Sequence, residues 1–378
     1  ISLLKVRGSY GLVGNDKTNS RFPYLTNISL NQREYTFGYE FDNTLWGTNI
    51  LLLGNDLATW EVGKKFNAGV EIGLFNNLTL ITDIFRENRS GIFMQRRVVP
   101  ATAGLGSTLP YANLGKVRNQ GVDLSLEYNK SIKKDFIVSA RANLTYATNT
   151  VMDKDEPSQQ EPYLSVIGHP INTIRGLISE GLFESDEEIA NWPTQTFQSD
   201  YRVGDIKYRD LNNDGKIDKN DYTAIGNPTI PEIVYGFGAS TQYKKVDFSF
   251  FFQGTGLVSL LMDNIYPFGA YNRNPYQFIA DDYWSESNPN ANAKYPRLDY
   301  QENKNNNQES TYWLRDASFI RLKNLEIGYS VNSFRFYLAG NNLLTFSSFK
   351  NWDPEMGGGN GLKYPPQRTA RIGFQYNF

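Results

Sequence analysis

Apolar and polar residues alternate along this chain in segments of about ten residues, a period that predicts amphipathic β-strands joined as hairpins. The clearest hairpin spans residues 234–253, and its turn is expected at Lys244-Lys245. One face of both strands is apolar, and the other carries glycine and polar side chains. The apolar face consists of Tyr235, Phe237, Ala239, Thr241, Tyr243, Val246, Phe248, Phe250 and Phe252.

The same alternation recurs on both sides of this hairpin. We predict roughly a dozen strands, about half of a 22-stranded outer-membrane barrel. Turns of a few residues alternate with long loops, at approximately 15–62, 88–119, 149–232, 257–316 and 347–367. The predicted strands lie at 3–14, near 35–41, at 66–74, 78–84, 122–128 and 136–146, around 173–183, and at 234–243, 246–253, 319–330, 334–343 and 368–378.

This arrangement predicts an all-β fold, a transmembrane antiparallel β-barrel. Outer-membrane barrels combine short periplasmic turns with long external loops, and aromatic residues gather at their strand ends. A soluble β-sandwich also has alternating strands, but loops of this length are unusual in a compact soluble domain. A barrel strand needs only about ten residues, so the lack of a long apolar run is compatible with it. The strand-end aromatic residues are Tyr128, Tyr146, Tyr243, Tyr329 and Tyr376.

Composition narrows the function further. The chain contains no cysteine, which excludes disulfides and thiolate metal sites. Its formal net charge is −2 and its basic residues are dispersed, so nucleic acid is not an expected partner. The chain starts at Ile1 without a signal-peptide pattern, and we expect residues 1–378 to be the C-terminal part of a longer barrel protein.

The last strand alternates up to the final residue. Phe374, Tyr376 and Phe378 share its apolar face, and such an aromatic terminal strand resembles the signal that outer-membrane assembly machinery reads. An ordinary final strand of a soluble sheet is the alternative, although chain ends of soluble proteins usually fray.

Several segments, spread in order over nearly the whole chain, are similar to the SusC/RagA-type TonB-dependent transporters of Bacteroidetes-like bacteria. The opening strand Leu4-Lys5-Val6-Arg7-Gly8-Ser9-Tyr10-Gly11 is one of them. The most recognisable stretch begins with Gly204-Asp205-Ile206-Lys207-Tyr208-Arg209-Asp210. The others are Gly226-Asn227-Pro228, Tyr235-Gly236-Phe237, Phe251-Phe252-Gln253-Gly254, Asn288-Pro289-Asn290-Ala291, Tyr295-Pro296-Arg297-Leu298, the run from Leu314 to Asn324, and Tyr364-Pro365-Pro366-Gln367-Arg368-Thr369.

The resemblance implies a 22-stranded barrel of the bacterial outer membrane that imports a bulky nutrient, an oligosaccharide or an oligopeptide, with no enzymatic step. It also implies an N-terminal plug, a TonB box that couples the barrel to the inner membrane, and a SusD-like surface lipoprotein as a lid. The plug and the N-terminal half of the barrel are not in this sequence. The alternative from another class is a passive porin or an adhesive barrel.

One local motif predicts a metal site. A twelve-residue calcium loop places oxygen ligands at positions 1, 3, 5, 7, 9 and 12, with glycine at position 6. Gly215 occupies the glycine position, and Asp at position 12 resembles the dockerin variant of the loop. We expect a structural Ca²⁺ in an external loop; an Asx-rich turn without metal is the alternative. The candidate ligands are Asp210, Asn212, Asp214, Lys216 (through its carbonyl), Asp218 and Asp221.

The remaining candidate residues do not form a motif that points to one function. Aromatic residues of the loop after residue 257 could stack on sugars, hold peptide side chains, contact the lid protein or pack against each other. His169 is the single histidine, so a Ser-His-carboxylate hydrolase is only formally open. A soluble dockerin-like module would need a second, paired calcium loop, and only one is visible. The aromatic candidates for substrate binding are Tyr266, Phe268, Tyr271, Tyr276 and Trp284.

Overall fold

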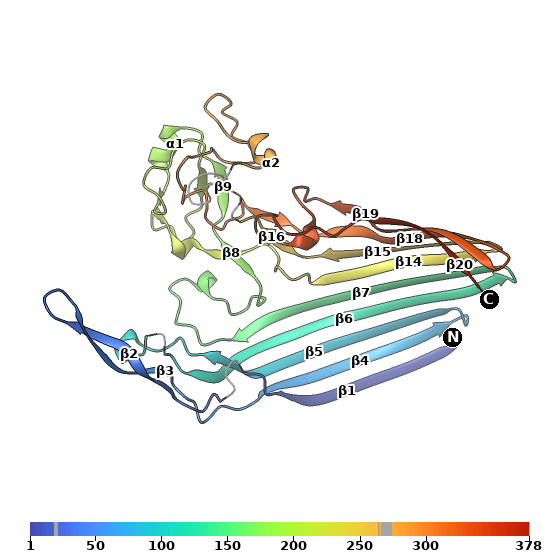
Figure 1. The fold of residues 1–378 in the computed structure, drawn as a ribbon, viewed down its shortest axis with the longest axis horizontal. Coiled ribbons are helices and arrows are strands. Elements are labelled where there is room, and N and C mark those ends of the chain that lie inside the picture. Colours follow the sequence, from blue (N-terminus) through green and yellow to red (C-terminus); the bar gives the residue numbers. More distant parts are fainter. Residues whose placement is uncertain (19–21, 107, 264, 266–273, 378) are drawn as a thin grey trace.

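The computed structural model describes residues 1–18, 22–106, 108–263, 265 and 274–377, without the side chains of residues 33 and 34. Ten strands within these ranges form one antiparallel sheet, in which spatial neighbours follow chain order without a crossover (Figure 1). They are β1 (Leu3–Asn15), β4 (Glu61–Leu74), β5 (Leu78–Gln95), β6 (Tyr111–Lys133), β7 (Phe136–Asp153), β14 (Ile233–Tyr243), β15 (Val246–Gly256), β18 (Phe319–Val331), β19 (Phe334–Ser347) and β20 (Thr369–Tyr376).

The two ends of this sheet differ in their connections. Turns of two or three residues follow β4, β6, β14 and β18, and Asn76, Lys244 and Asn332 adopt the left-handed backbone that tight hairpins require. Long connections leave the opposite end, as the alternation predicts. The predicted loop at 88–119 is shorter than expected, because β5 continues to Gln95 and β6 begins at Tyr111.

One face of the sheet, called the apolar face below, exposes rows of hydrophobic side chains. Phe248, Ile327, Leu338 and Ile372 stand opposite one another on β15, β18, β19 and β20. Their exposed fractions are 37%, 48%, 53% and 87%. Such a surface is unfavourable in water and favourable against lipid hydrocarbon, so it fits the outer surface of a membrane barrel.

Aromatic residues close both ends of the apolar face. Tyr243 packs edge-on against Phe136 at 5.6 Å between ring centroids, and Tyr376 lies 4.9 Å from Phe334, both near the short turns. Tyr146 lies toward the opposite end, where it pairs with Ile233. These positions agree with the predicted interfacial aromatic residues.

The large sheet of ten strands is called the wall below. Two segments that were predicted as strands of the wall lie outside it. Residues 173–183 form β8 (Ile174–Gly176) and β9 (Ser179–Leu182), which pair outside the large sheet. Leu177, Leu182 and Phe183 are at most 1% exposed, so this segment is buried inside protein and not against lipid. The prediction failed because alternation reports a strand with two unlike faces and not the sheet to which the strand belongs.

The other misplaced strand lies near residues 35–41. It belongs to a ribbon of β2 (Asn27–Phe37) and β3 (Asn43–Leu52), separate from the large sheet. Gly38, with φ of +95°, starts the turn that ends β2. In Figure 1 this ribbon projects away from the sheet. With both segments removed, the dozen predicted wall strands become the ten of the described sheet.

The connections 154–232, 257–318 and 348–368, in their described residues, fold together into a structure that we call the cap. It stands over the long-loop end of the sheet (Figure 1). Its elements are η2 (Pro162–Leu164), β8, β9, α1 (Asp186–Asn191), β10 (Thr194–Gln195), β11 (Ile206–Tyr208), β12 (Lys216–Ile217), η3 (Lys219–Asp221), β13 (Thr223–Ile225), β16 (Ser259–Leu261), α2 (Gln277–Ala280), β17 (Leu314–Asp316) and η5 (Pro354–Met356); η1 (Ala101–Ala103) lies outside the cap, between β5 and β6.

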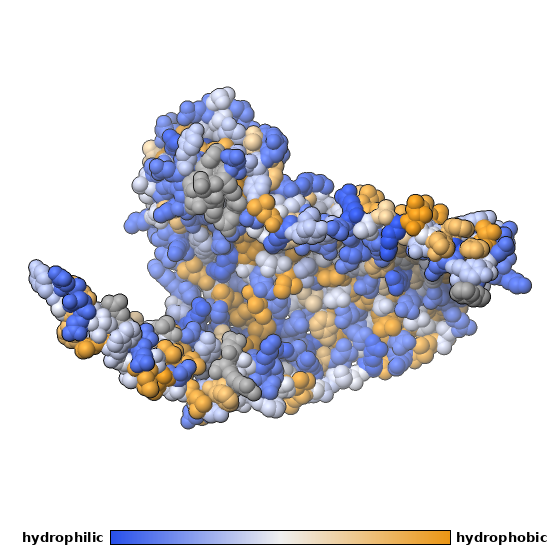
Figure 2. Space-filling view, viewed as in Figure 1, coloured by the Kyte–Doolittle hydropathy of each residue, from blue (hydrophilic) through white to orange (hydrophobic). Residues whose placement is uncertain are grey.

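Most of the buried hydrophobic residues of the described chain lie in the cap and not in the sheet. In Figure 2 the outer surface of the cap is largely hydrophilic, whereas apolar side chains show on the sheet. None of the helices in the described ranges has the length and apolar character needed to cross a bilayer. The cap core includes Leu177, Leu182, Ile206, Tyr208, Ile217, Leu260, Met262, Ile279, Trp284, Tyr295, Trp313 and Phe349.

Candidate functional site: the polar face and the cap

The second face of the sheet, called the polar face below, carries charged side chains that pair across neighbouring strands. Arg7 on β1 forms an ion pair with Asp83 on β5, and Arg335 on β19 forms ion pairs with Asp247 and Glu326. In a barrel, the face opposite the apolar one lines the lumen. The lumen is therefore lined by fixed charges of both signs, which suits a wet passage for a polar solute.

Two of these ion pairs reach over a strand at a glycine. Gly69 on β4 lies between Arg7 and Asp83, and a Cβ there would lie 2.8 Å from Arg7 Nε. Gly328 on β18 lies between Asp247 and Arg335, and a Cβ there would lie 2.7 Å from an Arg335 nitrogen. The glycines make room for the bridging side chains, a role that backbone periodicity alone does not reveal.

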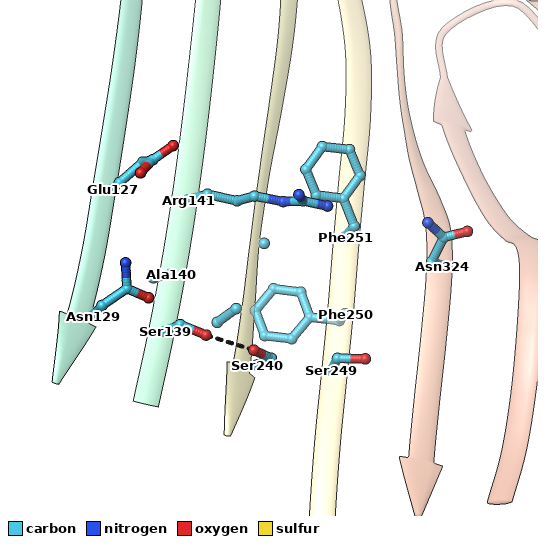
Figure 3. A pocket seen from close by; sticks show the side chains of 12 residues that line it. Glu127, Asn129, Ser139, Ala140, Arg141, Ser240, Ser249, Phe250, Phe251 and Asn324 are labelled. Atoms are coloured by element: carbon cyan, nitrogen blue, oxygen red, sulfur yellow. Dashed lines mark hydrogen bonds between the residues drawn. The ribbon is translucent and has the colours of Figure 1, made fainter. Parts of the chain in front are cut away.

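A cavity of about 440 Å³ lies on the polar face, in the half nearer the short turns. Figure 3 shows side chains that line it. The Arg141 guanidinium lies over the Phe251 ring, 5.0 Å from its centroid, in a cation–π contact that crosses β14 at Gly238. Ser139 and Ser240 share a hydrogen bond of 2.6 Å (Figure 3). The cavity is lined by polar groups and by two aromatic residues, Phe250 and Phe251.

The cap is held by a buried polar cluster. Asp205 has no exposed surface, and its carboxylate pairs with Arg297, whose Nε lies 2.8 Å from Oδ1. The side-chain amides of Asn303 and Asn306 donate to the same carboxylate at 3.0 and 2.7 Å. Burial raises the pKa of Asp205, and the Arg297 charge and these hydrogen bonds oppose that rise.

A second layer of amides extends this cluster. Gln195 donates to the Asn305 side chain at 2.7 Å and accepts from the Tyr208 backbone N–H at 2.7 Å. The Tyr208 hydroxyl donates to the Asn305 carbonyl at 2.7 Å, and burial raises the pKa of that hydroxyl well above its usual value. Because each buried amide is partnered, the loops that carry these residues are fixed relative to one another.

The predicted calcium loop lies in the cap between β11 and β13. Asp210 accepts from the backbone N–H groups of Asn213 (2.7 Å) and Gly215 (2.9 Å), and Asp214 accepts from Lys216 at 2.9 Å. Both Asp221 oxygens accept backbone N–H groups, from Leu211 and Asp218. These hydrogen bonds are those of an Asx-rich turn, and in the described residues no three His, Cys, Asp or Glu side chains gather closely enough to hold a metal.

The loop sequence supplies every oxygen donor that a calcium site needs. The donors fit Ca²⁺ in number and type, while the carboxylates are engaged by backbone N–H groups. Asn212 Oδ1 accepts from the Asp214 N–H at 3.1 Å, and Asp218 Oδ1 accepts from Asn220 at 2.6 Å. The calcium site therefore stays a prediction.

The aromatic substrate candidates divide into two groups. Tyr266, Phe268 and Tyr271 lie outside the described residues. Tyr276 stacks on Phe278 at 5.1 Å and donates its hydroxyl to the Asn360 carbonyl at 3.0 Å. Trp284 is 7% exposed and packs against Gly204, where a Cβ would lie 2.8 Å from Cζ3 of its ring. Of the alternatives for these two residues, the structure shows packing within the cap core.

His169 and the run Gly357-Gly358-Gly359 both help to hold the loops. The His169 carbonyl accepts the backbone N–H of Val151 at 2.9 Å, so its segment continues the hydrogen bonding of β7. The backbone N–H of Gly359 donates to Leu261 at 2.9 Å, and a Cβ at Gly358 would lie 2.7 Å from the Leu261 oxygen. The glycines allow one loop of the cap to lie directly against β16.

The terminal strand places Phe374 and Tyr376 on the apolar face, opposite Phe336 and Phe334 of β19. Phe378 lies outside the described residues. The lipid-facing placement of Phe374 and Tyr376 agrees with the sequence analysis, while their role as an assembly signal stays a prediction.

Sequence reasoning missed the bridges of the polar face and the buried cluster around Asp205. Glycines at polar-face positions such as Gly69 and Gly238 were a usable signal, because a glycine inside a strand often marks the close approach of another group. The repeated Asn residues at 303–307 gave no signal, since such a run usually indicates an exposed loop.

Comparison with known proteins places these features in a family. The family described as "TonB dependent receptor-like, beta-barrel" matches residues 4–343. The TonB-dependent receptor P26 of Formosa agariphila is 28% identical over 414 residues, covering 99% of this chain and 40% of the relative. The TonB-dependent receptor SusC of Bacteroides thetaiotaomicron is 24% identical over 401 residues. The chain spans about 40% of the length of these curated relatives.

Solved structures agree with the fold. The structure of the RagAB peptide transporter superimposes with a TM-score of 0.74 at 24% identity, covering 99% of this chain and 41% of that chain. The RagAB peptide importer in its "open-open" state gives the same TM-score and identity. Together with the family match, the likeness confirms that the ten described strands form part of a β-barrel of the TonB-dependent receptor kind.

Proposed function

This chain belongs to the TonB dependent receptor-like β-barrel family and is an outer-membrane protein, and we propose that it forms part of an energised importer for a bulky nutrient. One observation carries the proposal: a sheet with an apolar outer face and an ion-paired inner face ends in a folded cap. Such a wall confines a polar solute in a wet passage, and the cap controls entry at one end.

The remainder of the importer comes from the same polypeptide in this proposal. β1 and β20 are the two edges of the described sheet, and an unpaired strand edge within lipid would leave backbone groups unsatisfied. An N-terminal half of the barrel therefore pairs with both edges and closes the wall. A plug from that half fills the lumen, and its TonB box couples opening to the inner membrane.

A SusD-like surface lipoprotein is the proposed lid. The cap offers it a prefolded, largely hydrophilic surface at the long-loop end of the barrel (Figure 2). The likeness to the RagAB peptide transporter and to the TonB-dependent receptor SusC supports this partnership. The cargo is an oligopeptide or an oligosaccharide; the RagAB proteins are described as peptide importers. No covalent change of the cargo is part of the proposal.

Uptake in the native host tests the proposal. Cells with the full-length gene should accumulate labelled oligopeptides or oligosaccharides, and deletion of either this gene or the gene for TonB should abolish that uptake. The matched control is a small solute that crosses general porins, whose uptake should not change in either strain. A passive porin or adhesive barrel gives the opposite result, because uptake would continue without TonB or would never depend on this gene.

A structural Ca²⁺ in the Asp210–Asp221 loop is a second, smaller part of the proposal. The loop joins β11 to β13, and Tyr163 donates its hydroxyl to the Asn220 carbonyl at 2.8 Å, so its shape is linked to the neighbouring segment of the cap. A bound cation would neutralise the mutual repulsion of its four aspartates. Calcium titration of the purified full-length protein, followed by thermal unfolding of the cap, measures it directly.

A further inference from the structure

An apolar recess of about 290 Å³ lies on the polar face at the long-loop end, between β5, β6, β7 and the cap segment 166–175. Its position is unusual, because most side chains of this face are polar or ion-paired. Hydrophobic side chains from both the wall and the cap line it, namely Ile92, Met94, Val117, Val151, Val166 and Pro170.

A β-bulge builds the recess. The pairing of β5 with β6 shifts register between Ser90 and Ile92, where Gly91 has φ of +69°. Strict alternation would turn Ile92 to the apolar face, but the extra residue brings it to the same face as Arg89. Gly115 on β6 leaves space for this change, since a Cβ there would lie 3.0 Å from Ile92 and 3.3 Å from the Met94 sulfur.

Two charged groups of the recess are already engaged, and Lys154 and His169 also line it. Arg175 lines it, but its guanidinium donates to the carbonyl oxygens of Ser165 and Tyr163 at 3.1 and 2.7 Å. Asp153 pairs with Lys116 at 2.7 Å. The interior thus offers few free hydrogen-bonding partners to a ligand and favours a hydrocarbon group.

A second, polar recess of about 360 Å³ adjoins the first and shares Ile92, Val117 and Ile171 with it. Glu61 and Glu87 lie on either side of Arg89, with carboxylate oxygens 3.5 and 3.0 Å from its guanidinium. Asn119 and Asn149 complete its lining, so donors and acceptors of both charges stand beside an apolar hollow.

A ligand that fits both recesses has a hydrocarbon group next to a polar, hydrogen-bonding framework. A peptide has this form, since an apolar side chain projects from amide groups and charged termini. An oligosaccharide fits poorly: its hydroxyls would lose water in the apolar recess without gaining partners, and neither recess is lined by a tryptophan, tyrosine or phenylalanine that could stack on a sugar ring.

We propose that the two recesses form one binding site for an oligopeptide cargo, with an apolar side chain in the 290 Å³ recess and the adjacent main chain or terminus on Glu61, Glu87 and Arg89. The inference rests on the proposed import function and narrows its cargo from two classes to one. The site lies at the long-loop end of the polar face, beside the cap.

Binding to the purified full-length protein tests the site. The probes are a labelled pentapeptide with a central leucine, the same peptide with a central serine, and labelled maltohexaose. The wild-type protein should prefer the leucine peptide by about tenfold, in line with burial of one aliphatic side chain. Val117→Trp fills the recess and should remove that preference, while Ile81→Trp, on the same face but outside both recesses, should retain it.

A more conservative variant tests the same site in case Val117→Trp does not fold. Val117→Thr keeps the shape of the side chain and adds a hydroxyl, so it should weaken leucine-peptide binding about threefold to tenfold and leave serine-peptide binding unchanged. The site is rejected if folded Val117→Trp and Val117→Thr bind the leucine peptide like wild type, if wild type does not bind it, or if maltohexaose binds more tightly and responds to these changes.

Uptake separates this inference from the import function. If TonB-dependent uptake is observed but is indifferent to Val117→Trp, import stands and the peptide site is wrong. If the purified protein shows the predicted leucine preference but uptake persists without TonB, the site stands and energised import is wrong.

Discussion

The wall and the cap of this protein differ in how far their hydrophobic side chains are buried. Wall residues such as Leu338 and Ile372 are 53% and 87% exposed, whereas cap residues such as Leu177 and Ile206 have no exposed surface. Hydrophobic side chains of the wall are left for lipid to cover, whereas those of the cap are covered by other residues of the cap. The same chain therefore contains a membrane sheet, whose hydrophobic side chains need lipid to cover them, and a folded unit with its own packed core.

Polar groups follow the same division. On the wall, ion pairs such as Lys5 with Glu71 and Arg7 with Asp83 are accessible to solvent. In the cap, Asp205 and Arg297 are buried with their partners. Exposed pairs contribute little to stability, while a buried pair is costly to break because its remaining member keeps an unpaired charge.

The largest expected effect comes from breaking the buried pair. Arg297→Ala leaves the Asp205 carboxylate buried without its cation and should destabilise the cap by about 3–5 kcal/mol. Hydrogen exchange of the full-length protein should show loss of protection in residues 195–208 and 303–313, with the wall strands unchanged. Lys294→Ala is the matched control, because its ion pair with Asp282 is exposed and its loss should not change exchange. If Arg297→Ala also removed protection from the wall strands, the wall and the cap would not be separate units of stability.

A charge on the apolar face should act on the wall alone. Leu338→Arg places a guanidinium toward the lipid and should cost about 2–4 kcal/mol if the position lies near the bilayer midplane. Urea-dependent folding into lipid vesicles measures this cost. Ala339→Arg, one residue along β19 and on the polar face, is the control and should fold almost normally. Equal sensitivity at both positions would contradict the assignment of the two faces.

Filling a glycine on the polar face should have a smaller effect. Gly238→Val places side-chain atoms against the Phe250 backbone oxygen and the Phe251 ring, whose nearest atom lies 2.8 Å from the Cβ position, and should cost about 1–3 kcal/mol through overpacking. The resistance of the folded barrel to heat in detergent reports the loss. Gly11→Val is the control, since a Cβ at Gly11 would meet nothing within 4 Å. A similar loss in both variants would show that strand flexibility, and not the bridge, explains the glycine.

The smallest effect concerns calcium. If the Asp210–Asp221 loop binds Ca²⁺, free Ca²⁺ at about ten times the dissociation constant should stabilise the cap by about 1.4 kcal/mol. Chelation should lower the unfolding temperature of the cap and leave that of the wall unchanged. Asp210→Asn and Asp214→Asn together should remove the calcium response; a response that survives both changes would place the ion elsewhere.

Much of the wall could be predicted from sequence because the residues of each strand alternate between those that face lipid and those that face the polar side. Residues 234–253 alternate between hydrocarbon and polar groups, and the structure pairs them as β14 and β15 with the turn at Lys244-Lys245. Residues 173–183 show a similar pattern but enter the cap. Local periodicity reports that a segment has two unlike sides and does not report what covers each side.

The candidate sites were less accessible to sequence reasoning. The calcium motif was visible because its ligands lie within twelve residues, whereas Asp205 and Arg297 are 92 positions apart and meet only in the folded cap. The apolar recess depends on the bulge at Gly91, which changes the face on which Ile92 and Met94 lie. A single extra residue is invisible to a periodicity that continues normally on either side.

The amino-acid sequence by itself determined the strand class of the wall, its two faces, its hairpin turns and the family resemblance, because these depend on residues close together in the chain. The tertiary structure decided which strands join the wall, which loops form the cap and which distant charges meet. Those outcomes depend on register and on packing between segments far apart in sequence, and such contacts leave no periodic trace in the chain.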